Sequence, residues 1–422
     1  MAWCLRMVKR LEKAHFLTIF LVALILLSTM SFLVLNSFNG GVKETTESKN
    51  PNEFYVGVTF CGNTTAEAQL LVDRVKTYTN VFVLQSGPVS KNETATNEIC
   101  DYAVASGMRI IVFFGWFDPD FPWQVPWLDF AKQRYGDKFL GVYYYDEPGG
   151  AQIDYNWSLS FARSKMLNTY RYQVHAPAID AYLNGSAEFR NYDTAASIYT
   201  NAFKNDTDFQ MLKNRSITSF TSEYALYWYT YLAGYNVLLT QFGWNDTLTQ
   251  NIALTRGAAR MQNKTWGAII TWKYDQWPYL DTGEEIYKQM VMAYDAGAKY
   301  VTIFNYANDT KGTIPIMRDE HFEALEKFWN YIMDKPGNLP HSDEADVALV
   351  LPLNYGWGMR RSDDRIWYWG PDEKSSQIWN VSRVLLARYG TDLDIVYDDP
   401  AFPVIGKYNK IYYWNATLVN MD

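Results

Sequence analysis

Two adjacent carboxylates, Asp146 and Glu147, stand directly after the apolar and aromatic stretch 139–145, FLGVYYY. That stretch has no helical period and is typical of a buried strand. Pro148 and two glycines follow the acids, so the strand is expected to end there in a turn. Paired carboxyl groups can act as a general acid and a charge-stabilising anion when their surroundings separate their pKa values. The alternative is that both acids only cap a following helix.

The elements that would position these acids alternate between strand and helix patterns from residue 54 to 335, which predicts a (β/α)8 TIM barrel. Most of the strand patterns are short apolar runs, as expected for strands covered on both faces. The predicted strands are 54–60, 81–85, 109–116, 139–145, 217–222, 236–242, 267–274 and 299–306. The predicted helices are 66–78, 96–106, 127–135, 157–172, 226–233, 248–262, 284–296 and 320–333. Residues 175–215 are predicted to be a long inserted loop before the fifth strand.

In such a barrel the carboxyl ends of all the strands meet at one rim, where active sites lie. Polar and aromatic side chains follow several predicted strands: Trp116 and Asp118, Glu223, Gln241 and Trp244, Trp272, Tyr274 and Asp275, and Asn305. Aromatic rings suit the apolar faces of sugars, and carboxylates and amides suit their hydroxyl groups. We therefore predict a carbohydrate site with Glu147, Asp146, Asp275 and Glu223 as catalytic candidates and the other residues as substrate-binding candidates. Alternatively, the aromatic residues only plug the barrel mouth.

The motif YYYDEP at the fourth strand, the tryptophan-bearing seventh strand and the α/β segment after the barrel resemble (β/α)8-barrel glycoside hydrolases. The resemblance to retaining enzymes of the β-galactosidase type implies that Glu147 is the acid/base, with Asp146 where those enzymes have Asn. The adjacent acids also resemble those of hexosaminidases that use the acetamido group of the substrate. In that case Glu147 would protonate the leaving oxygen and Asp146 would orient the acetamide.

The chain departs from the retaining enzymes at the seventh strand, where they have a nucleophilic Glu and this chain has the sequence WKYD, residues 272–275. Asp275 or Glu223 could supply a second carboxylate, or the mechanism could be substrate-assisted. Retaining and inverting enzymes ordinarily place two carboxyl groups about 5–5.5 Å or 6.5–9.5 Å apart. A fourth alternative is a non-catalytic carbohydrate-binding or cell-surface structural glycoprotein built on the same barrel.

The first 53 residues predict a membrane anchor. Residues 16–35 carry no charge over 20 positions, the length that spans a bilayer. Residues 1–15 carry four Lys or Arg against one acid, which predicts a cytoplasmic tail before a transmembrane signal anchor. Residues 36–53, rich in Gly, Ser, Thr, Lys and Glu, predict a stalk. Eleven N-x-S/T sequons follow the apolar segment and none precedes it, which favours an extracellular position for the rest of the chain.

The C-terminal segment 341–422 follows the predicted linker KPGNLP at 335–340. It contains strand patterns at 346–351, 393–396 and 410–414 and a helical pattern at 376–389, which predict a small α/β domain. The alternative is an extension of the barrel without its own core.

Composition limits the partners. A formal net charge of −8 provides no basic surface for nucleic acid. Four scattered His and three Cys have no metal-ligand spacing, so no metal or other cofactor is expected. Only Cys61 and Cys100 could form a disulfide outside the cell, and the sequence leaves that pairing open.

Overall fold

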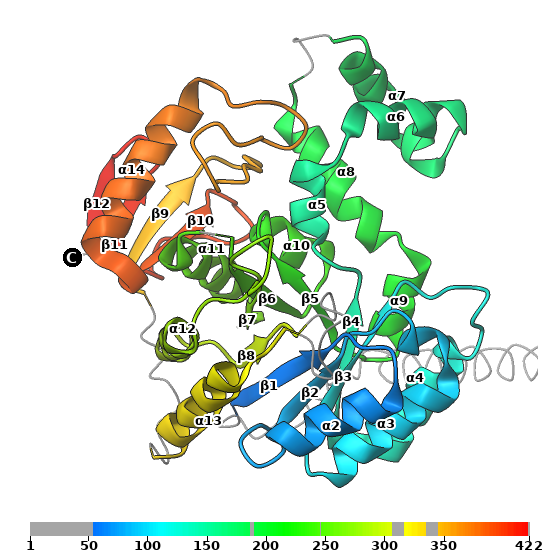
Figure 1. Ribbon diagram of the computed structural model, residues 1–422. Helices are drawn as coiled ribbons and strands as arrows, with labels where there is room; N and C mark the ends of the chain where they lie inside the picture. Colours follow the sequence, from blue (N-terminus) through cyan, green and yellow to red (C-terminus); the bar gives the residue numbers. More distant parts are fainter. Residues whose placement is uncertain (1–53, 186–189, 245, 306–315, 335–344, 421–422) are drawn as a thin grey trace, which may run out of the picture. The chain divides into compact units, whose positions relative to one another are not determined.

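The computed structural model describes residues 54–185, 190–244, 246–305, 316–334 and 345–420. Phe54–Asp422 form one compact unit. Eight parallel strands close into a barrel in sequence order (Figure 1). They are β1 (Tyr55–Phe60), β2 (Val81–Leu84), β3 (Arg109–Gly115), β4 (Phe139–Tyr144), β5 (Ser219–Glu223), β6 (Val237–Phe242), β7 (Thr265–Ile270) and β8 (Tyr300–Ile303). The predicted barrel is confirmed, and each predicted strand overlaps the corresponding observed one.

Helices follow the strands and pack around the barrel, as the sequence pattern predicts. They are α2 (Thr65–Val75), α3 (Glu93–Ala105), α4 (Gln124–Tyr135), α5 (Pro148–Asp154), α10 (Tyr227–Ala233), α11 (Leu248–Met261), α12 (Gly283–Asp295) and α13 (Asp319–Met333). Short 3-10 turns occur at Val89–Lys91, Gly136–Lys138 and Gly390–Asp392. Helices α2, α3 and α12 begin at a side chain that accepts a hydrogen bond from a free backbone N–H group; Thr64 also makes a capping box with Glu67 at the start of α2.

Side chains from alternating strand positions build two cores. Along β4, Tyr143 belongs to the core inside the barrel, whereas Tyr144 packs in the layer between the strands and the helices. At the amino-terminal end of the strands, Tyr55 and Tyr300 stack inside the barrel with ring centroids 4.7 Å apart. Since successive side chains of a strand point to opposite faces, this alternation also decides which rim residues can face a central cavity.

The prediction of a long loop at residues 175–215 is wrong. The chain between α5 and β5 contains α6 (Trp157–Met166), α7 (Tyr170–Leu183), α8 (Tyr192–Lys204) and α9 (Thr207–Asn214), of which the end of α7, α8 and α9 lie in 175–215. The predicted helix 157–172 is divided between α6 and α7 at Asn168, which has a left-handed backbone conformation. Asn191 and Asp206 cap α8 and α9, and α8 buries an apolar face. These caps and that face are helix signals, although Asn and Gly are also common in loops.

A second sheet, of four strands in the order β10-β9-β11-β12, follows the barrel. It consists of β9 (Val347–Leu351), β10 (Leu393–Tyr397), β11 (Lys410–Tyr413) and β12 (Leu418–Asn420), with α14 (Glu373–Tyr389) before β10. The first three strands are parallel and were predicted; β12 is antiparallel and was not. This sheet packs on α11, where the buried ion pair between Arg256 Nε and Asp394 Oδ1 measures 2.8 Å.

In the described ranges, no helix has both the length and the apolar character needed to cross a membrane. The predicted tail, anchor and stalk, residues 1–53, lie outside the described residues, as does the predicted linker at 335–340. Cys61 and Cys100 are both buried, free thiols.

Candidate active site

A strained turn after β4 carries the two adjacent acids to the carboxyl-terminal rim of the barrel. Tyr145 and Glu147 both have left-handed backbone conformations, with φ of 58° and 51°. Such conformations cost about 1–3 kcal/mol for a non-glycine residue and cluster at functional sites, where the surrounding structure maintains them. Glu147 is the N-cap of α5, and Pro148 is the first residue of that helix.

The two glycines after Pro148 allow α5 to lie directly on the chain at the end of β5. A Cβ atom on Gly149 would lie 2.4 Å from the carbonyl oxygen of Ala225, and one on Gly150 would lie 2.1 Å from the Tyr224 ring. The backbone N–H groups of both glycines donate hydrogen bonds to the Glu223 carboxylate, at 2.5 and 3.0 Å. The glycines therefore serve close packing, and the position of α5 sets the position of the acidic turn.

Glu223, one of the predicted catalytic candidates, holds the amino end of α5 and does not line the central cavity. Its side chain is fully buried and accepts a third hydrogen bond, from Thr230 Oγ1 at 2.9 Å. Burial raises its pKa to about 8, although the three donors favour the charged form. The structure thus gives Glu223 an anchoring position for α5.

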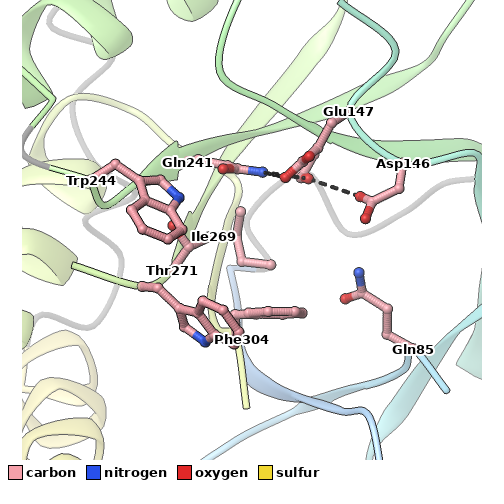
Figure 2. A pocket seen from close by; sticks show the side chains of 10 residues that line it. Gln85, Asp146, Glu147, Gln241, Trp244, Ile269, Thr271 and Phe304 are labelled. Carbon is pink, nitrogen blue, oxygen red and sulfur yellow. Dashed lines mark hydrogen bonds between the residues drawn. The ribbon is translucent and has the colours of Figure 1, made fainter. Parts of the chain in front are cut away.

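A cavity of about 360 Å³ opens at the rim beside Asp146 and Glu147 (Figure 2). The sequence-predicted residues that line it are Asp146, Glu147, Gln241, Trp244 and Trp272. Five further lining residues were not predicted: Gln85, Ser222, Ile269, Thr271 and Phe304. They come from the ends of strands β2, β5, β7 and β8, so the cavity is assembled from most of the barrel circumference.

Hydroxyl donors hold the Asp146 carboxylate in one orientation. Tyr143 Oη accepts the Ser222 N–H at 2.9 Å and therefore directs its own proton to Asp146 Oδ1, 2.5 Å away. Ser222 Oγ donates to the same oxygen at 3.2 Å. In the described part of the chain, Asp146 Oδ2 has no protein donor. Partial loss of hydration raises the pKa of Asp146, and the two hydroxyl donors oppose that rise; the side chain stays accessible to water in the cavity.

Glu147 has fewer donors and a higher affinity for a proton. Gln241 Nε2 donates to Glu147 Oε1 and lies 3.0 Å from Ser222 Oγ (Figure 2). Burial raises the pKa of Glu147 to about 7, the negative charge of Asp146 adds to the rise, and the Gln241 amide opposes it. Because Asp146 accepts two hydroxyl donors and Glu147 accepts one amide donor, we assign the negative charge to Asp146 and the proton to Glu147 near neutral pH.

Two tryptophans form an aromatic part of the wall of the same cavity. The rings of Trp244 and Trp272 meet edge to face with centroids 6.1 Å apart. The chain after β6 lies close to the chain after β7 at Gly243, where a Cβ atom would lie 2.3 Å from Thr271 Oγ1. Thr271 Oγ1 and Gln85 Oε1 are buried and have no hydrogen-bond partner among the described residues. The cavity therefore offers an aromatic surface together with the two carboxyl groups and the Gln241 amide, a combination that suits a sugar ring.

The other sequence candidates lie outside this cavity. Trp116, Tyr274 and Asp275 are exposed. Asp118 forms a turn in which its carboxylate accepts the Asp120 N–H at 3.0 Å. Asn305 is buried and accepts the Met317 N–H. Among the described lining residues, Asp146 and Glu147 are thus the carboxylates, with none across the cavity.

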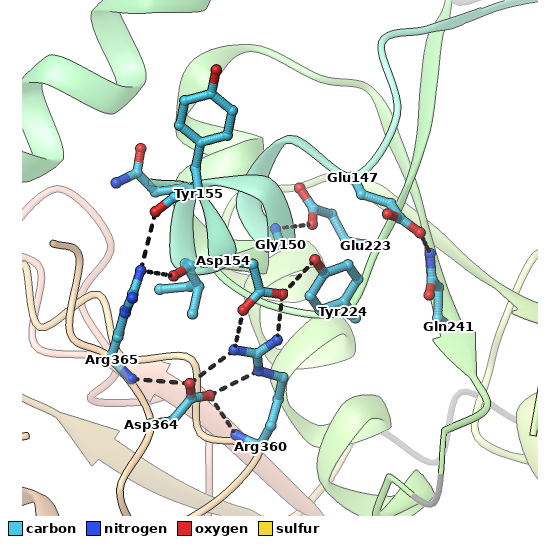
Figure 3. A network of polar contacts seen from close by, with 12 residues as sticks. Glu147, Gly150, Asp154, Tyr155, Glu223, Tyr224, Gln241, Arg360, Asp364 and Arg365 are labelled. Carbon is cyan, nitrogen blue, oxygen red and sulfur yellow. Dashed lines mark hydrogen bonds and ion pairs between the residues drawn. The ribbon is translucent and has the colours of Figure 1, made fainter. Parts of the chain in front are cut away.

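The carboxyl end of α5 is held by the chain between β9 and α14 (Figure 3). Arg360 makes two 2.8 Å contacts with the Asp154 carboxylate and also pairs with the fully buried Asp364. Arg365 Nη1 donates to the carbonyl oxygens of Ile153 and Tyr155, both at 3.1 Å. Helix α5 is therefore fixed by Glu223 at one end and by the C-terminal segment at the other.

No protein-family model matches this sequence, and no curated protein matches it either. Among solved structures, the chain is similar to a mutant β-1,3-glucanosyltransferase of Rhizomucor miehei, with 12% identity, a TM-score of 0.38 and coverage of 63% of this chain and 94% of that one. A β-glucosidase of Exiguobacterium marinum is 8% identical, with a TM-score of 0.38 and coverage of 68% of this chain and 100% of that one. A 3-hexulose-6-phosphate synthase is 12% identical, with a TM-score of 0.32 and coverage of 65% of this chain and 99% of that one. These low similarities identify no family, and a function must be argued from the site itself.

Proposed function

We propose that this protein is a glycoside hydrolase that cleaves glycosides of 2-acetamido sugars by substrate-assisted catalysis. The observation that carries the proposal is the pair Asp146 and Glu147, which share one aromatic cavity but have different hydrogen-bond donors. Asp275 and Glu223, the candidates for a separate second carboxylate, lie outside that cavity. A carboxylate beside the acid and none opposite it suits a reaction in which the substrate supplies its own nucleophile.

In the first step, Glu147 donates its proton to the glycosidic oxygen while the acetamido carbonyl oxygen attacks the anomeric carbon. The glycosidic bond breaks, the alcohol leaves, and a cyclic oxazolinium forms. The Asp146 carboxylate accepts a hydrogen bond from the acetamide N–H and balances the positive charge that develops there. The raised pKa of Glu147, about 7, keeps the acid protonated near neutrality.

In the second step, the Glu147 carboxylate takes a proton from a water molecule as the oxygen of that water attacks the anomeric carbon. The ring of the oxazolinium opens, the acetamide is restored, and the product keeps the configuration of the substrate. Tyr143 and Ser222 keep Asp146 oriented throughout, because their hydroxyl groups donate to one of its two oxygens. Trp244 and Trp272 would pack against the sugar ring.

The test compares 4-methylumbelliferyl glycosides that differ only in the 2-acetamido group, in both anomeric configurations. We expect turnover of 2-acetamido substrates, competitive inhibition by the matching thiazoline, and no turnover of the 2-hydroxy analogues. Asp146→Asn should lower turnover by about 10²–10³-fold. Equal hydrolysis of the 2-hydroxy glycosides would contradict the mechanism. Saturable glycan binding without hydrolysis of any substrate would support the alternative of a non-catalytic carbohydrate-binding protein.

We also propose that residues 16–35 anchor the protein in the cell membrane, with 1–15 in the cytoplasm and the barrel outside. The distribution of sequons supports this proposal, since every described sequon asparagine is exposed: Asn63, Asn92, Asn156, Asn184, Asn205, Asn214, Asn263, Asn380 and Asn415. Peptide N-glycosidase should shift the electrophoretic mobility of the native protein, and protease added to intact cells should remove the barrel. A barrel protected from that protease would contradict the orientation.

A further inference from the structure

A second cavity, of about 240 Å³, lies among helices α5, α6, α7 and α8. These helices cluster on one side of the barrel in Figure 1. Tyr145 and Pro148 line this second cavity, whereas the intervening Asp146 and Glu147 line the central one. The two cavities therefore share the turn after β4, and the hydrolytic mechanism above makes no use of the second.

Arg171, at the start of α7, is the one charged residue among the twelve that line the second cavity. It is half-buried, and its guanidinium lies over the Trp157 ring, 5.6 Å from the centroid. In the described part of the protein this guanidinium makes no ion pair and no hydrogen bond to a side chain or carbonyl group. A guanidinium partly removed from water, without a counter-charge, favours an anionic ligand with two or more acceptor oxygens.

Gln152, on α5, also lines the cavity, but its side chain is only 4% exposed. Its amide faces Tyr368, which is not among the lining residues, so Arg171 is the donor that the cavity presents to a ligand.

Aromatic rings supply an apolar surface beside the Arg171 guanidinium. Tyr155 and Tyr145 are 54% and 42% exposed, which is high for rings of this size, and Tyr155 contacts Trp157 with centroids 5.4 Å apart. Exposed aromatic rings next to a cation match a sugar ring that bears an acidic group.

We propose that the second cavity binds an acidic sugar residue through Arg171 and Tyr155. The acidic group is a carboxylate, as in a uronic acid, or a sulfate ester, because both present several acceptor oxygens to a guanidinium. The apolar face of the sugar packs on Tyr155, and the acidic group lies against the Arg171 guanidinium. This site goes beyond the proposed hydrolysis, and its occupancy is measured as binding without turnover.

The test titrates the purified protein with methyl β-glucuronide, glucose 6-sulfate and the neutral methyl β-glucoside while following ligand binding by saturation-transfer NMR. The acidic sugars should bind saturably and about tenfold or more tightly than the neutral one. Arg171→Gln should reduce acidic-sugar affinity to the neutral level. The matched control Arg163→Gln removes an exposed arginine from neighbouring α6 and should leave affinity unchanged.

Two further variants separate this site from the catalytic cavity. Tyr155→Ala removes an exposed ring, should preserve folding, and should weaken the binding of all three sugars. Glu147→Gln should leave acidic-sugar binding intact, so the inference stands or fails independently of hydrolysis. The absence of saturable binding, equal affinity for the neutral and acidic sugars, or unchanged affinity in Arg171→Gln would each overturn it. Preference for only one of the acidic probes would identify the acid group that the site accepts.

Discussion

The raised pKa of Glu147 makes a quantitative prediction about stability that needs no substrate. The pKa rises from its ordinary 4.5 to about 7, so the folded protein favours the protonated form. The resulting contribution to the free energy of unfolding is fully present below about pH 4.5 and is lost as the pH rises through 7. At 1.36 kcal/mol per pKa unit, the free energy of unfolding would change by about 3.4 kcal/mol over this pH range. Water in the cavity reduces that change to about 2–3 kcal/mol.

The perturbation is Glu147→Gln, which keeps the size of the side chain and stays neutral at every pH. At pH 8 the variant should be about 2–3 kcal/mol more stable than the wild type, because the wild type must ionise a carboxyl group beside Asp146. At pH 4 the free energies of unfolding of the two proteins should agree within about 0.5 kcal/mol. Loss of the proton donor should also lower the hydrolysis of unactivated glycosides by about 10²–10⁴-fold.

Guanidinium denaturation curves of both proteins, measured every half unit from pH 4 to pH 8.5, provide the free energies of unfolding. Glu98→Gln on the surface of α3 is the control, since it removes an equal charge from an exposed position. Its stability difference from the wild type should change little with pH. If Glu147→Gln behaved like this control, the anion of Glu147 would not be disfavoured by the fold, and its assignment as the general acid would lose its physical basis.

Three other perturbations test how the site is held and what it binds. Arg360→Met should destabilise the protein by about 3 kcal/mol, because it leaves the buried Asp364 carboxylate without its cation. Asp154→Asn should destabilise it by only about 1 kcal/mol, because Asp154 is partly exposed. Equal losses of stability in denaturation experiments would contradict this asymmetry. Gly150→Ala should cost about 1–3 kcal/mol because its Cβ would overlap the Tyr224 ring, and adding Tyr224→Ala should change that cost in a double-mutant cycle; additive costs would count against the overlap. Trp272→Ala should weaken glycan binding at least tenfold in calorimetric titrations while leaving the pH dependence of unfolding unchanged.

The barrel was predictable because its strands are short apolar runs with helices between them. What the sequence could not provide was the direction of each side chain at the rim. In β5, Ser222 faces the cavity and Glu223 lies under α5, although both stand at the end of the same strand. Strands buried on both faces have no polar side from which this alternation can be inferred.

Contacts between distant segments were equally beyond sequence reasoning. The role of the glycines after Pro148 depends on the β5 chain, and the anchoring of α5 depends on Arg360, 206 positions after Asp154. Tyr143 was predicted as part of the buried strand, but its hydrogen bond to Asp146 becomes apparent only from the barrel geometry. A polar residue at the carboxyl end of an otherwise apolar predicted strand, such as Gln85 or Ser222, was the available signal for the missed part of the site.

The attachment of α5 to the C-terminal segment also sets when the site can be completed during synthesis. At about 5–20 residues per second, the 206 residues between Asp154 and Arg360 take a ribosome about 10–40 s to add. During that time the turn with Asp146 and Glu147 has already been made, but one end of α5 lacks its partner. A chain that stopped after β8 could contain every strand of the barrel and both acids, yet the helix that follows them would be held at its amino end alone.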